Sequence, residues 1–319
     1  MKQEQILVIG VGLLIVAFAT VWEVSQRFPR KRGGAEITPE TLRIGENRPC
    51  IWLFYNDSEV NSRHWSDFMA RSSRVINIPL LNTFYETIAS KNGDRYRIEV
   101  VGGLQGVADR LGGWEALPKK LRNPKARVTE AEEDWIRAAL LSNFGGLWLS
   151  PSVVCLKGFG DLPTNKIVAF GQDDGPLYGS PIPGFRALWS PVPRHPLFVE
   201  WEEACRSRLD NQLGGVQVRK DSASDWVALA GKYREDVEVC VKEELGRDPR
   251  TNKKLQLEDL FAAGTGGRLP FEIPDTAIYL VVPYKDLLDR RLYGWVLRSS
   301  EEQILESDLV LAHILNSLS

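Results

Sequence analysis

The sequence has few residues of the types that build small metal-bound or disulfide-bonded domains. It contains four cysteines and three histidines among 319 residues. No two cysteines form a CxxC pair, which argues against a zinc site, and a domain of this size does not depend on a disulfide framework. We interpret Cys155 and Cys205, which lie in apolar or helical contexts, as buried free thiols.

The sequence motifs of several enzyme classes are also absent. The chain has no GxSxG, no HExxH, no Walker loop and no glycine-rich dinucleotide fingerprint. Nothing therefore points to the hydrolases, metalloproteases, nucleotide triphosphatases or dehydrogenases that carry these motifs. His64, His195 and His313 are interpreted as surface or core residues rather than as catalytic bases.

An excess of charge of one sign is lacking too. The net charge is −2 and the isoelectric point is near 6.1. No basic field is present that could hold a nucleic-acid backbone, and we expect no nucleic-acid partner. The composition is that of a folded protein, 43% apolar and 26% charged, without low-complexity tracts or internal repeats.

What the chain does have is one long apolar run. Residues 6–22 (ILVIGVGLLIVAFATVW) are seventeen apolar or small residues without a charge, close to the roughly 17–20 residues that cross a bilayer. We predict a transmembrane anchor here, preceded by a short tail, residues 1–5. A cleavable signal peptide is the alternative, but the small-x-small site that it needs, at 17–19, lies inside the run.

Basic residues flank this run unequally. Arg27, Arg30, Lys31 and Arg32 follow it, whereas only Lys2 precedes it. By the positive-inside rule, this bias predicts a single-pass membrane protein whose large C-terminal part is cytosolic. A lumenal domain and a location in a virion membrane are the alternatives.

The rest of the chain divides into a linker and one folded domain. Residues 23–48 are polar and rich in glycine and charge, which is typical of a stalk. From 49 to 319, short apolar runs alternate with helical patterns and give way to a helix-rich end, which predicts an α/β domain. Strands are expected at 50–55, 96–101, 147–149, 153–155, 166–170, 185–189 and 277–282, and helices at 61–72, 79–91, 129–144, 196–209, 223–244 and 300–317.

One of these helices has sequence signals at both ends. Thr129 and Glu132 form a capping box, and further acidic residues in the first turn suit the positive end of the helix dipole. Gly145 and Gly146 end the helix. Two short strands then flank the polar turn 150–152.

The segment 134–152 resembles the core of a known family. An Asp-x-x-Arg pair, Asp134 and Arg137, leads into the glycine pair 145–146 and then Trp148. With this spacing the segment resembles the sugar transferases grouped as capsular polysaccharide synthesis proteins and the related DXD-containing, mannosyltransferase-like enzymes. The resemblance implies a GT-A fold, which is the Rossmann-type fold of nucleotide-diphospho-sugar transferases, together with a nucleotide-sugar donor and a divalent metal.

A second resemblance is to uncharacterised proteins of large DNA viruses. It rests on the Asn-x-Arg-x-Trp-x-x-Phe run at 61–68, the Arg-Ser-Ser run at 71–73 and a Gly-Gly-x-x-x-Pro-x-Ser stretch without the acid pair. Together the two resemblances cover about residues 50–160. They imply a viral relative of the transferases with a degenerate DXD motif.

Ser150 and Ser152 stand where the family has its Asp-x-Asp pair. The metal held by that pair neutralises the leaving nucleoside diphosphate, and neutral hydroxyl oxygens hold Mg²⁺ or Mn²⁺ poorly. We therefore expect no metal in this turn. Asp173 and Asp174 are the nearest alternative carboxylates, and Mn²⁺ or Mg²⁺ is expected only if they form a relocated site. An ordinary turn is the competing interpretation of that pair.

The resemblance implies six donor-binding residues, and no catalytic residue is assigned. They are Asp134, Arg137, Gly145, Gly146, Ser150 and Ser152. Structural explanations compete for several of them. An acid in the first turns offsets the helix dipole, an arginine pairs with an acid along the helix, and glycines end it.

Two functions compete. In the first, the protein is a membrane-anchored glycosyltransferase that moves a sugar from a nucleotide-sugar to a glycan or lipid acceptor, with Arg or Lys side chains or a relocated carboxylate serving the diphosphate. In the second, it is an inactive pseudo-glycosyltransferase that acts as a membrane-bound binding or virion component. The loss of both acids favours the second, and the intact Asp134, Arg137 and glycine pair favour the first.

Overall fold

The computed structural model describes residues 48–56, 79–124, 126, 128–174, 181–211, 222–264 and 269–318. All of them belong to one unit, Arg48–Ser319. The predicted tail, the anchor at 6–22, nearly all of the stalk and the helix at 61–72 lie outside the described residues. Within the described ranges, no helix is both long and apolar enough to span a bilayer.

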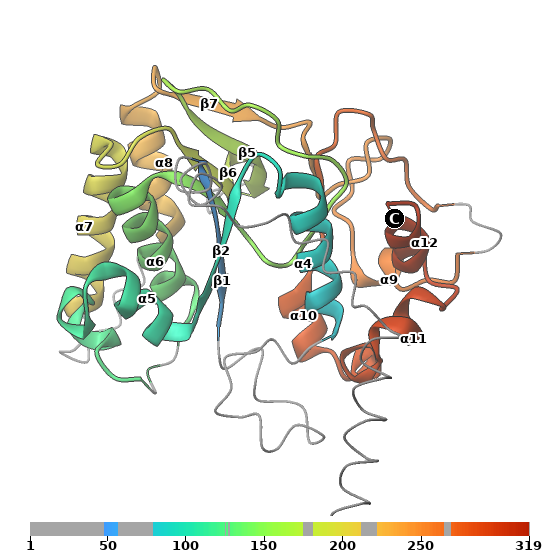
Figure 1. Ribbon diagram of the computed structural model, residues 1–319. Helices are drawn as coiled ribbons and strands as arrows, with labels where there is room; N and C mark the ends of the chain where they lie inside the picture. The colour runs from blue at the N-terminus through green and yellow to red at the C-terminus, as the bar shows by residue number, and fades with distance from the viewer. Residues whose placement is uncertain are drawn as a thin grey trace, which may run out of the picture. The chain divides into compact units, whose positions relative to one another are not determined.

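The main sheet has six strands in the order β2-β1-β3-β6-β5-β7 (Figure 1). These are β1 Cys50–Tyr55, β2 Arg97–Gly102, β3 Gly146–Leu149, β5 Ile167–Asp174, β6 Pro181–Ser190 and β7 Val237–Cys240. β1 pairs in parallel with β2 and β3, and β5 pairs in parallel with β7. β6 is antiparallel to both of its neighbours, β3 and β5. A mostly parallel sheet buries both faces, which explains the continuous apolar sequence of β1.

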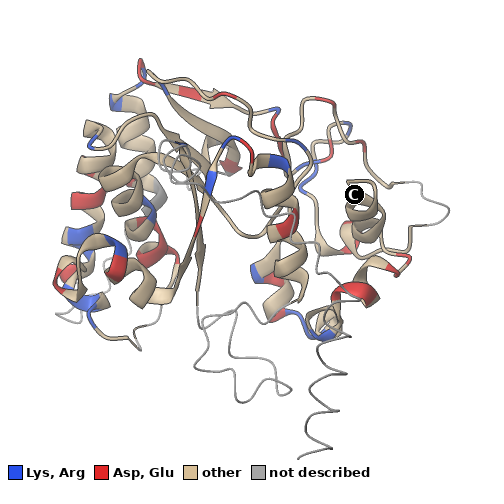
Figure 2. Cartoon of the chain, viewed as in Figure 1, with Lys and Arg blue, Asp and Glu red and all other residues tan. Residues whose placement is uncertain are grey.

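Helices cover one face of the main sheet. They are α5 Gly103–Leu111, α6 Glu130–Phe144, α7 Pro196–Asn211 and α8 Ser222–Lys232, with the short turns η2 Trp114–Ala116 and η3 Lys119–Leu121 (Figure 1). The core on this side is rich in tryptophan. Trp135, Trp148, Trp201 and Trp226 are all fully buried in it. Residues of both charge signs lie on the outer surfaces of these helices (Figure 2).

The opposite face packs against α4 Pro79–Asn92 and a C-terminal group of short elements. That group holds a second sheet in the order β4-β9-β8, with β4 Val153–Cys155, β8 Glu244–Leu245 and β9 Tyr279–Val281. Its helical pieces are α9 Leu257–Leu260, α10 Tyr284–Asp289, η6 Arg291–Tyr293, η7 Val296–Arg298, α11 Glu301–Leu305 and α12 Val310–Asn316. Alternate residues of β1 enter the two cores, because Ile51, Leu53 and Tyr55 face this side and Trp52 and Phe54 face the other.

The predicted α/β class is confirmed, and most predicted strands and helices are present. Two helix predictions are wrong in part. The helix expected over 223–244 ends at Lys232, and residues 237–240 form edge strand β7 instead. Valines at alternate positions there follow a strand period, not a helical one. The helix expected over 300–317 is two helices, because Leu309 forms a bridge to Ala263 between them. α5 follows directly after β2 and was not predicted from the sequence.

The capping box at the start of α6 is confirmed. The Glu132 carboxylate accepts hydrogen bonds from the Thr129 backbone N–H at 2.8 Å and from the Thr129 hydroxyl. Lys120 Nζ lies 2.5 Å from the other carboxylate oxygen, although the Glu132 side chain is only 1% exposed. Burial disfavours the ionised form of Glu132, but the bonds from Lys120 and Thr129 outweigh it, so its pKa is lowered from the usual value.

This arrangement predicts a pH-dependent contribution to stability. Glu132→Gln should reduce the free energy of unfolding by about 1–3 kcal/mol at neutral pH, because Lys120 and the helix start lose a buried charged acceptor. Since the pKa of Glu132 is lowered in the folded state, this contribution is complete above its unfolded pKa and is lost as the pH falls through the folded value. Urea unfolding of both proteins across this range measures it.

Glu130→Gln is the matched control, because that carboxylate is in the same helical turn but 81% exposed. It should change stability little. A Glu132→Gln effect that grows as the solution is acidified would contradict the assignment.

Candidate functional site

A cavity of about 510 Å³ opens between the main sheet and the C-terminal elements. Small-molecule sites commonly have volumes of roughly 300–1,000 Å³. Four groups of residues line it. They are the first turns of α6 (Glu130, Glu133, Asp134, Arg137), the turn after β3 (Ser150, Ser152), β5 and β6 (Gln172, Asp173, Ile182, Phe185, Arg186) and the C-terminal wall (Glu244, Gly246, Arg247, Lys254, Leu255, Gln256, Val281–Asp286).

The chain reversal at the glycine pair brings the first two groups together. Asp134 lies roughly three helical turns before Gly145, which is about 16 Å at the rise of an α-helix. Ser150 lies four residues beyond Gly146, which is about 13 Å at the rise of a strand. The first turns of α6 and the end of β3 therefore reach the same edge of the sheet, and this edge lines the cavity.

The glycine pair itself does not line the cavity. Gly145 and Gly146 have φ values of 64° and 91°, which residues with a side chain rarely adopt. A Cβ on Gly146 would lie 2.6 Å from the carbonyl oxygen of Cys50, so the missing side chain allows β3 to approach β1. The Trp52 indole donates to the Gly145 carbonyl at 2.8 Å. Of the six predicted donor-binding residues, the structure brings Asp134, Arg137, Ser150 and Ser152 to the cavity, whereas the two glycines lie outside its lining, where α6 ends and β3 begins.

Arg137 is held rigidly in the cavity wall. Its Nη1 lies 2.6 Å from Asp134 Oδ1 and its Nη2 lies 3.4 Å from Glu133 Oε1. The guanidinium carbon lies 5.0 Å from the ring centroid of Trp148 and 4.9 Å from that of Phe185. Cation–π contacts of this kind stabilise a desolvated guanidinium. The sequence left two interpretations of Arg137 open, an ion pair along the helix and a contact with the donor. The ion pair is present, and the paired side chain lines the cavity.

The serine turn offers only neutral oxygens. The hydroxyls of Ser150 and Ser152 lie 2.9 Å apart and hydrogen-bond to each other. The Ser150 backbone N–H donates to the carbonyl of Arg186 at 2.7 Å, which continues the pairing of β3 with β6 past the last strand residue. The turn is therefore fixed to the strand that carries Arg186.

Three charged side chains that line the cavity pair with one another. Arg186 Nη1 lies 2.6 Å from Asp173 Oδ1 and 3.5 Å from Glu244 Oε1. The Tyr279 hydroxyl donates to Glu244 Oε2 at 2.8 Å. Burial raises the pKa of Glu244, although Arg186 and Tyr279 oppose the shift. Burial alone would lower the pKa of Arg186, but Glu244 and Asp173 raise it, so Arg186 stays charged.

Gly171 makes room for the Glu244 carboxylate, and Gly184 allows β6 to approach β5 closely. β5 has a bulge between Phe170 and Gln172, and Gly171 within it has a φ of 81°. A Cβ at Gly171 would collide with the carboxyl group of Glu244. Across the hairpin, a Cβ at Gly184 would collide with the Phe170 carbonyl oxygen. Asp173 and Asp174 thus lie at the end of β5 and not in an ordinary turn, and the Asp173 side chain lines the cavity. The side chain of Asp174 is not described.

Arg186, Glu244 and Tyr279 were not predicted from the sequence. Arg186 is the one charged residue among the ten residues of β6. A single charge in an otherwise uncharged strand was the one sequence signal that could have pointed to a functional role for it. Its contact with Glu244 spans 58 positions and joins different sheets. No local pattern in the sequence links these residues.

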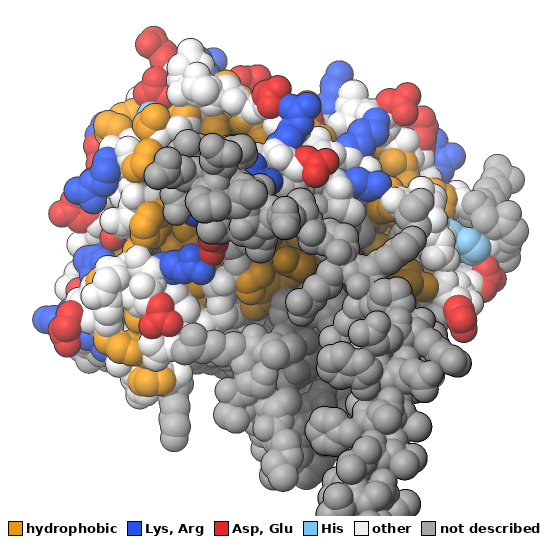
Figure 3. All heavy atoms as spheres, viewed as in Figure 1, with side chains coloured by type: hydrophobic (Ala, Val, Ile, Leu, Met, Phe, Trp, Pro, Cys, Tyr) orange, Lys and Arg blue, Asp and Glu red, His pale blue; other side chains and the backbone are white. Residues whose placement is uncertain are grey.

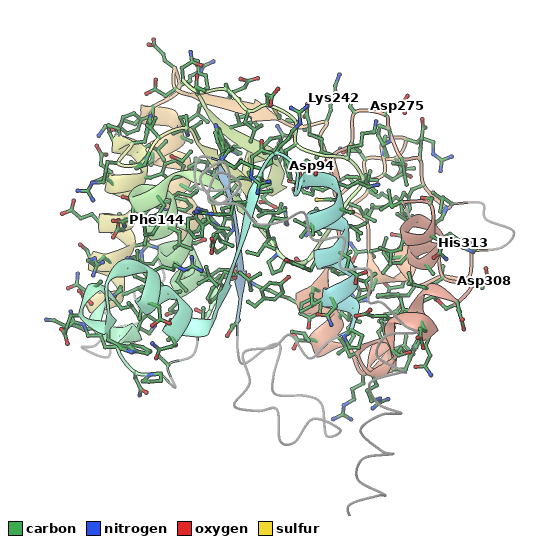
Figure 4. All side chains as sticks on the ribbon, in the orientation of Figure 1. Asp94, Phe144, Lys242, Asp275, Asp308 and His313 are labelled. Atoms are coloured by element: carbon green, nitrogen blue, oxygen red, sulfur yellow. The ribbon has the colours of Figure 1, made fainter. Side chains whose placement is uncertain are left out.

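The histidines and cysteines of the described region lie away from the cavity lining. His313, on α12, contacts Asp308 at 2.8 Å (Figure 4), and His195 Nδ1 accepts from the Leu197 N–H at the start of α7. The four cysteines are free, and burial raises the pKa of Cys155 to about 12. Cys155 and Cys205 are buried, as predicted. On the visible face, basic and acidic side chains are interspersed (Figure 3).

No protein-family model and no curated protein matches the sequence. Solved structures with a similar chain path include "PaToxG Glycosyltransferase" (16% identity, TM-score 0.36), of which 69% is covered by 59% of this chain. A glycosyltransferase involved in the glycosylation of the major capsid of PBCV-1 matches at 11% identity and a TM-score of 0.35, over 74% of this chain and 95% of that one. The apo-form glycosyltransferase GlyE in Streptococcus pneumoniae TIGR4 matches at 10% identity and a TM-score of 0.36, over 85% and 62%. These neighbours are glycosyltransferases, but the likeness is too distant to define a family or to transfer residue roles.

The room made for Glu244 gives a prediction on stability. Gly171→Ala should destabilise the protein by about 1–3 kcal/mol more than Gly160→Ala, because only the former forces a collision in a packed interior. Gly160 is the matched control, since its φ of 67° imposes similar backbone strain while a Cβ there meets nothing within 4 Å. Thermal unfolding of the two variants measures the difference.

Glu244→Ala removes the group with which the new methyl collides. In that background the additional cost of Gly171→Ala should shrink. Equal costs for Gly171→Ala and Gly160→Ala in the native background would contradict the assigned packing.

Proposed function

We propose that this protein binds a nucleotide-sugar in the 510 Å³ cavity and transfers the sugar to a glycan or lipid acceptor. The observation that carries the proposal is the convergence of Asp134, Arg137, Ser150 and Ser152 on that cavity. These residues come from the segment that resembles capsular polysaccharide and DXD-type transferases. The chain reversal at the glycine pair brings these four side chains, though not the glycines themselves, to one ligand-sized cavity.

The proposed reaction requires stabilisation of negative charge. When the bond between the sugar and the diphosphate breaks, charge develops on the leaving phosphate oxygens, and fixed positive groups near them lower the barrier. Arg137 and Arg186 both line the cavity and are held in place by carboxylates. Lys285, from α10, also lies at the cavity, 3.4 Å from Glu130 and 3.5 Å from Glu133.

The residues at this site do not fit the divalent metal that the resemblance implies. Ser150 and Ser152 supply neutral hydroxyls that bond to each other. Asp173 and Glu244 supply carboxylates, but both contact Arg186. Among the residues that the structure describes, no group of three or more His, Cys, Asp or Glu could hold a metal ion. The proposed reaction therefore includes no metal-bound step and no relocated metal site at Asp173 and Asp174.

A non-enzymatic role is the second candidate. The specific observation in its favour is the ion pairing of Asp173 and Glu244 with Arg186, because these acidic residues neutralise a cation of the protein itself. On this alternative the protein is a pseudo-glycosyltransferase that serves as a membrane-bound binding or virion component.

We also propose that residues 6–22 anchor the protein in a membrane as a single span with the folded domain in the cytosol. The support is the uncharged length of the run and the excess of basic residues after it.

The anchor predicts a change of fractionation. Replacement of Leu13 and Leu14 by arginine should move the full chain from the membrane pellet to the carbonate-soluble fraction, because two charges at a bilayer centre cost several kcal/mol, roughly 2.5–3.5 each. The same replacement at Ser25 and Gln26, beyond the run, is the control and should leave it in the pellet. A pelleted Leu13/Leu14 variant would contradict the anchor.

Donor binding predicts a ligand-dependent rise in melting temperature. UDP- or GDP-sugars at about 100 times their Kd should stabilise the native protein by about 2.7 kcal/mol, because they bind only the folded state. Differential scanning fluorimetry of the full chain in detergent measures the shift, with and without Mn²⁺.

Arg137→Gln should abolish this shift, whereas Arg95→Gln should preserve it. Arg95 is an exposed arginine paired with Asp161 outside the cavity. No shift with any sugar nucleotide, in the presence or absence of Mn²⁺, would overturn the transferase proposal and favour the non-enzymatic role.

A further inference from the structure

Arg186 lies beside the turn that lacks the acid pair. Its backbone carbonyl accepts the hydrogen bond of the Ser150 N–H, and Ala187 is opposite Leu149 in the register of β6 with β3. The Arg186 side chain therefore starts one strand away from Ser150 and lines the same cavity. A cationic group is thus present next to the place where the family has its metal-binding aspartates.

Both ion-pair contacts of Arg186 use a single nitrogen. Nη1 contacts Asp173 at 2.6 Å and Glu244 at 3.5 Å. Nε and Nη2 form no hydrogen bond with any residue in the described ranges. The side chain is still 26% exposed at the cavity. The Nε–Nη2 edge of a guanidinium holds two parallel N–H donors, which is the geometry that binds a phosphate in a bidentate manner.

The surroundings hold this guanidinium in one orientation. Glu244 is itself fixed by the hydroxyl of fully buried Tyr279 at 2.8 Å, and Gly171 leaves the space that its carboxyl group fills. The Glu244 side chain is 6% exposed and that of Asp173 is 15% exposed. A binding group that is already ordered loses little conformational entropy when a ligand arrives.

The same two carboxylates could not serve a metal while Arg186 is present. Asp173 and Glu244 converge on Nη1 from different sheets, β5 and β8. A divalent cation would need their oxygens at about 2.0–2.6 Å, in the space that Nη1 fills. Asp173 Oδ2 is buried without a hydrogen-bond partner, so a further oxygen ligand would be available if the guanidinium were removed.

We propose that Arg186 is the resident cation of the cavity, in the place of a divalent ion, and that it binds the diphosphate of the donor through Nε and Nη2. The identity of this ligand rests on the proposed function, whereas the exclusion of a metal by the guanidinium does not. Diphosphate binding by the native protein is then independent of divalent metal. Removal of Arg186 leaves two facing carboxylates that accept one.

The first experiment tests the cation site without any nucleotide. Titration of MnCl₂ into the full chain in detergent, followed by calorimetry and by the electron paramagnetic resonance signal of free Mn²⁺, should show no saturable site in the native protein. Arg186→Ala should gain one site, and the additional change Asp173→Asn should remove it again, because that change deletes one of the converging carboxylates. Arg95→Ala, with the same loss of charge outside the cavity, should gain none.

The second experiment tests the diphosphate contact with UDP and GDP as probes. The native protein should bind one of them with the same Kd in EDTA and in MnCl₂. Arg186→Ala in EDTA should weaken binding about 10- to 100-fold, as expected for loss of a charged hydrogen-bonded pair. Arg186→Lys should lose about tenfold, since an ammonium keeps the charge but not the fork. Mn²⁺ should restore part of the affinity of Arg186→Ala only.

The outcomes separate this proposal from the proposed function. A native protein that binds neither probe, together with a Mn²⁺ site in Arg186→Ala, would overturn the transferase function and keep the cation substitution. Mn²⁺-dependent probe binding by the native protein, or an Arg186→Ala variant that folds and gains no Mn²⁺ site, would overturn the substitution. If Arg186→Ala does not fold by circular dichroism, Arg186→Met keeps the volume of the side chain and is read in the same way.

Discussion

The close approach of β3 to β1 at Gly146 is the constraint on which the site depends. A Cβ at this position would lie 2.6 Å from the Cys50 carbonyl oxygen, and Gly145 before it adopts a φ of 64°. The two glycines allow α6 to end and the chain to reverse directly into the sheet. The helix from Arg137 to the reversal and the strand from the reversal to Ser150 have similar lengths, so these two residues lie at the same edge of the sheet. Larger residues here would separate these walls of the cavity.

The charges at that edge follow one physical rule. Buried charges persist when each has a partner, because an isolated ion in a low dielectric is very unfavourable. Arg137 is paired with Asp134 and Glu133 and makes cation–π contacts with two aromatic rings, and Arg186 is paired with Asp173 and Glu244. These pairs hold the two guanidinium groups in place at the surface of the cavity. Their arrangement is the basis of the proposed binding of an anionic ligand without a metal ion.

Local signals in the sequence predicted the elements that depend on interactions between residues close together in the chain. Alternation and apolar runs located most strands, and the capping residues Thr129 and Glu132 located the start of α6. Prediction was wrong where local preference is overruled by pairing. Residues 237–240 join β5 at the edge of the sheet, and residues near Leu309 leave the helical path to bridge Ala263.

By itself, the sequence determined the capped acidic helix and its glycine end, because each depends on neighbours within a few residues. It also determined the α/β class, through the alternation of short apolar runs with helical patterns. The tertiary structure alone decided which distant charges meet. Arg186, Asp173 and Glu244 come from three strands in two sheets, and the contact of Arg186 with Glu244 spans 58 positions. Such a meeting depends on the packing of one sheet against the other and on the space left by Gly171. Neither has a signature in any local stretch of sequence.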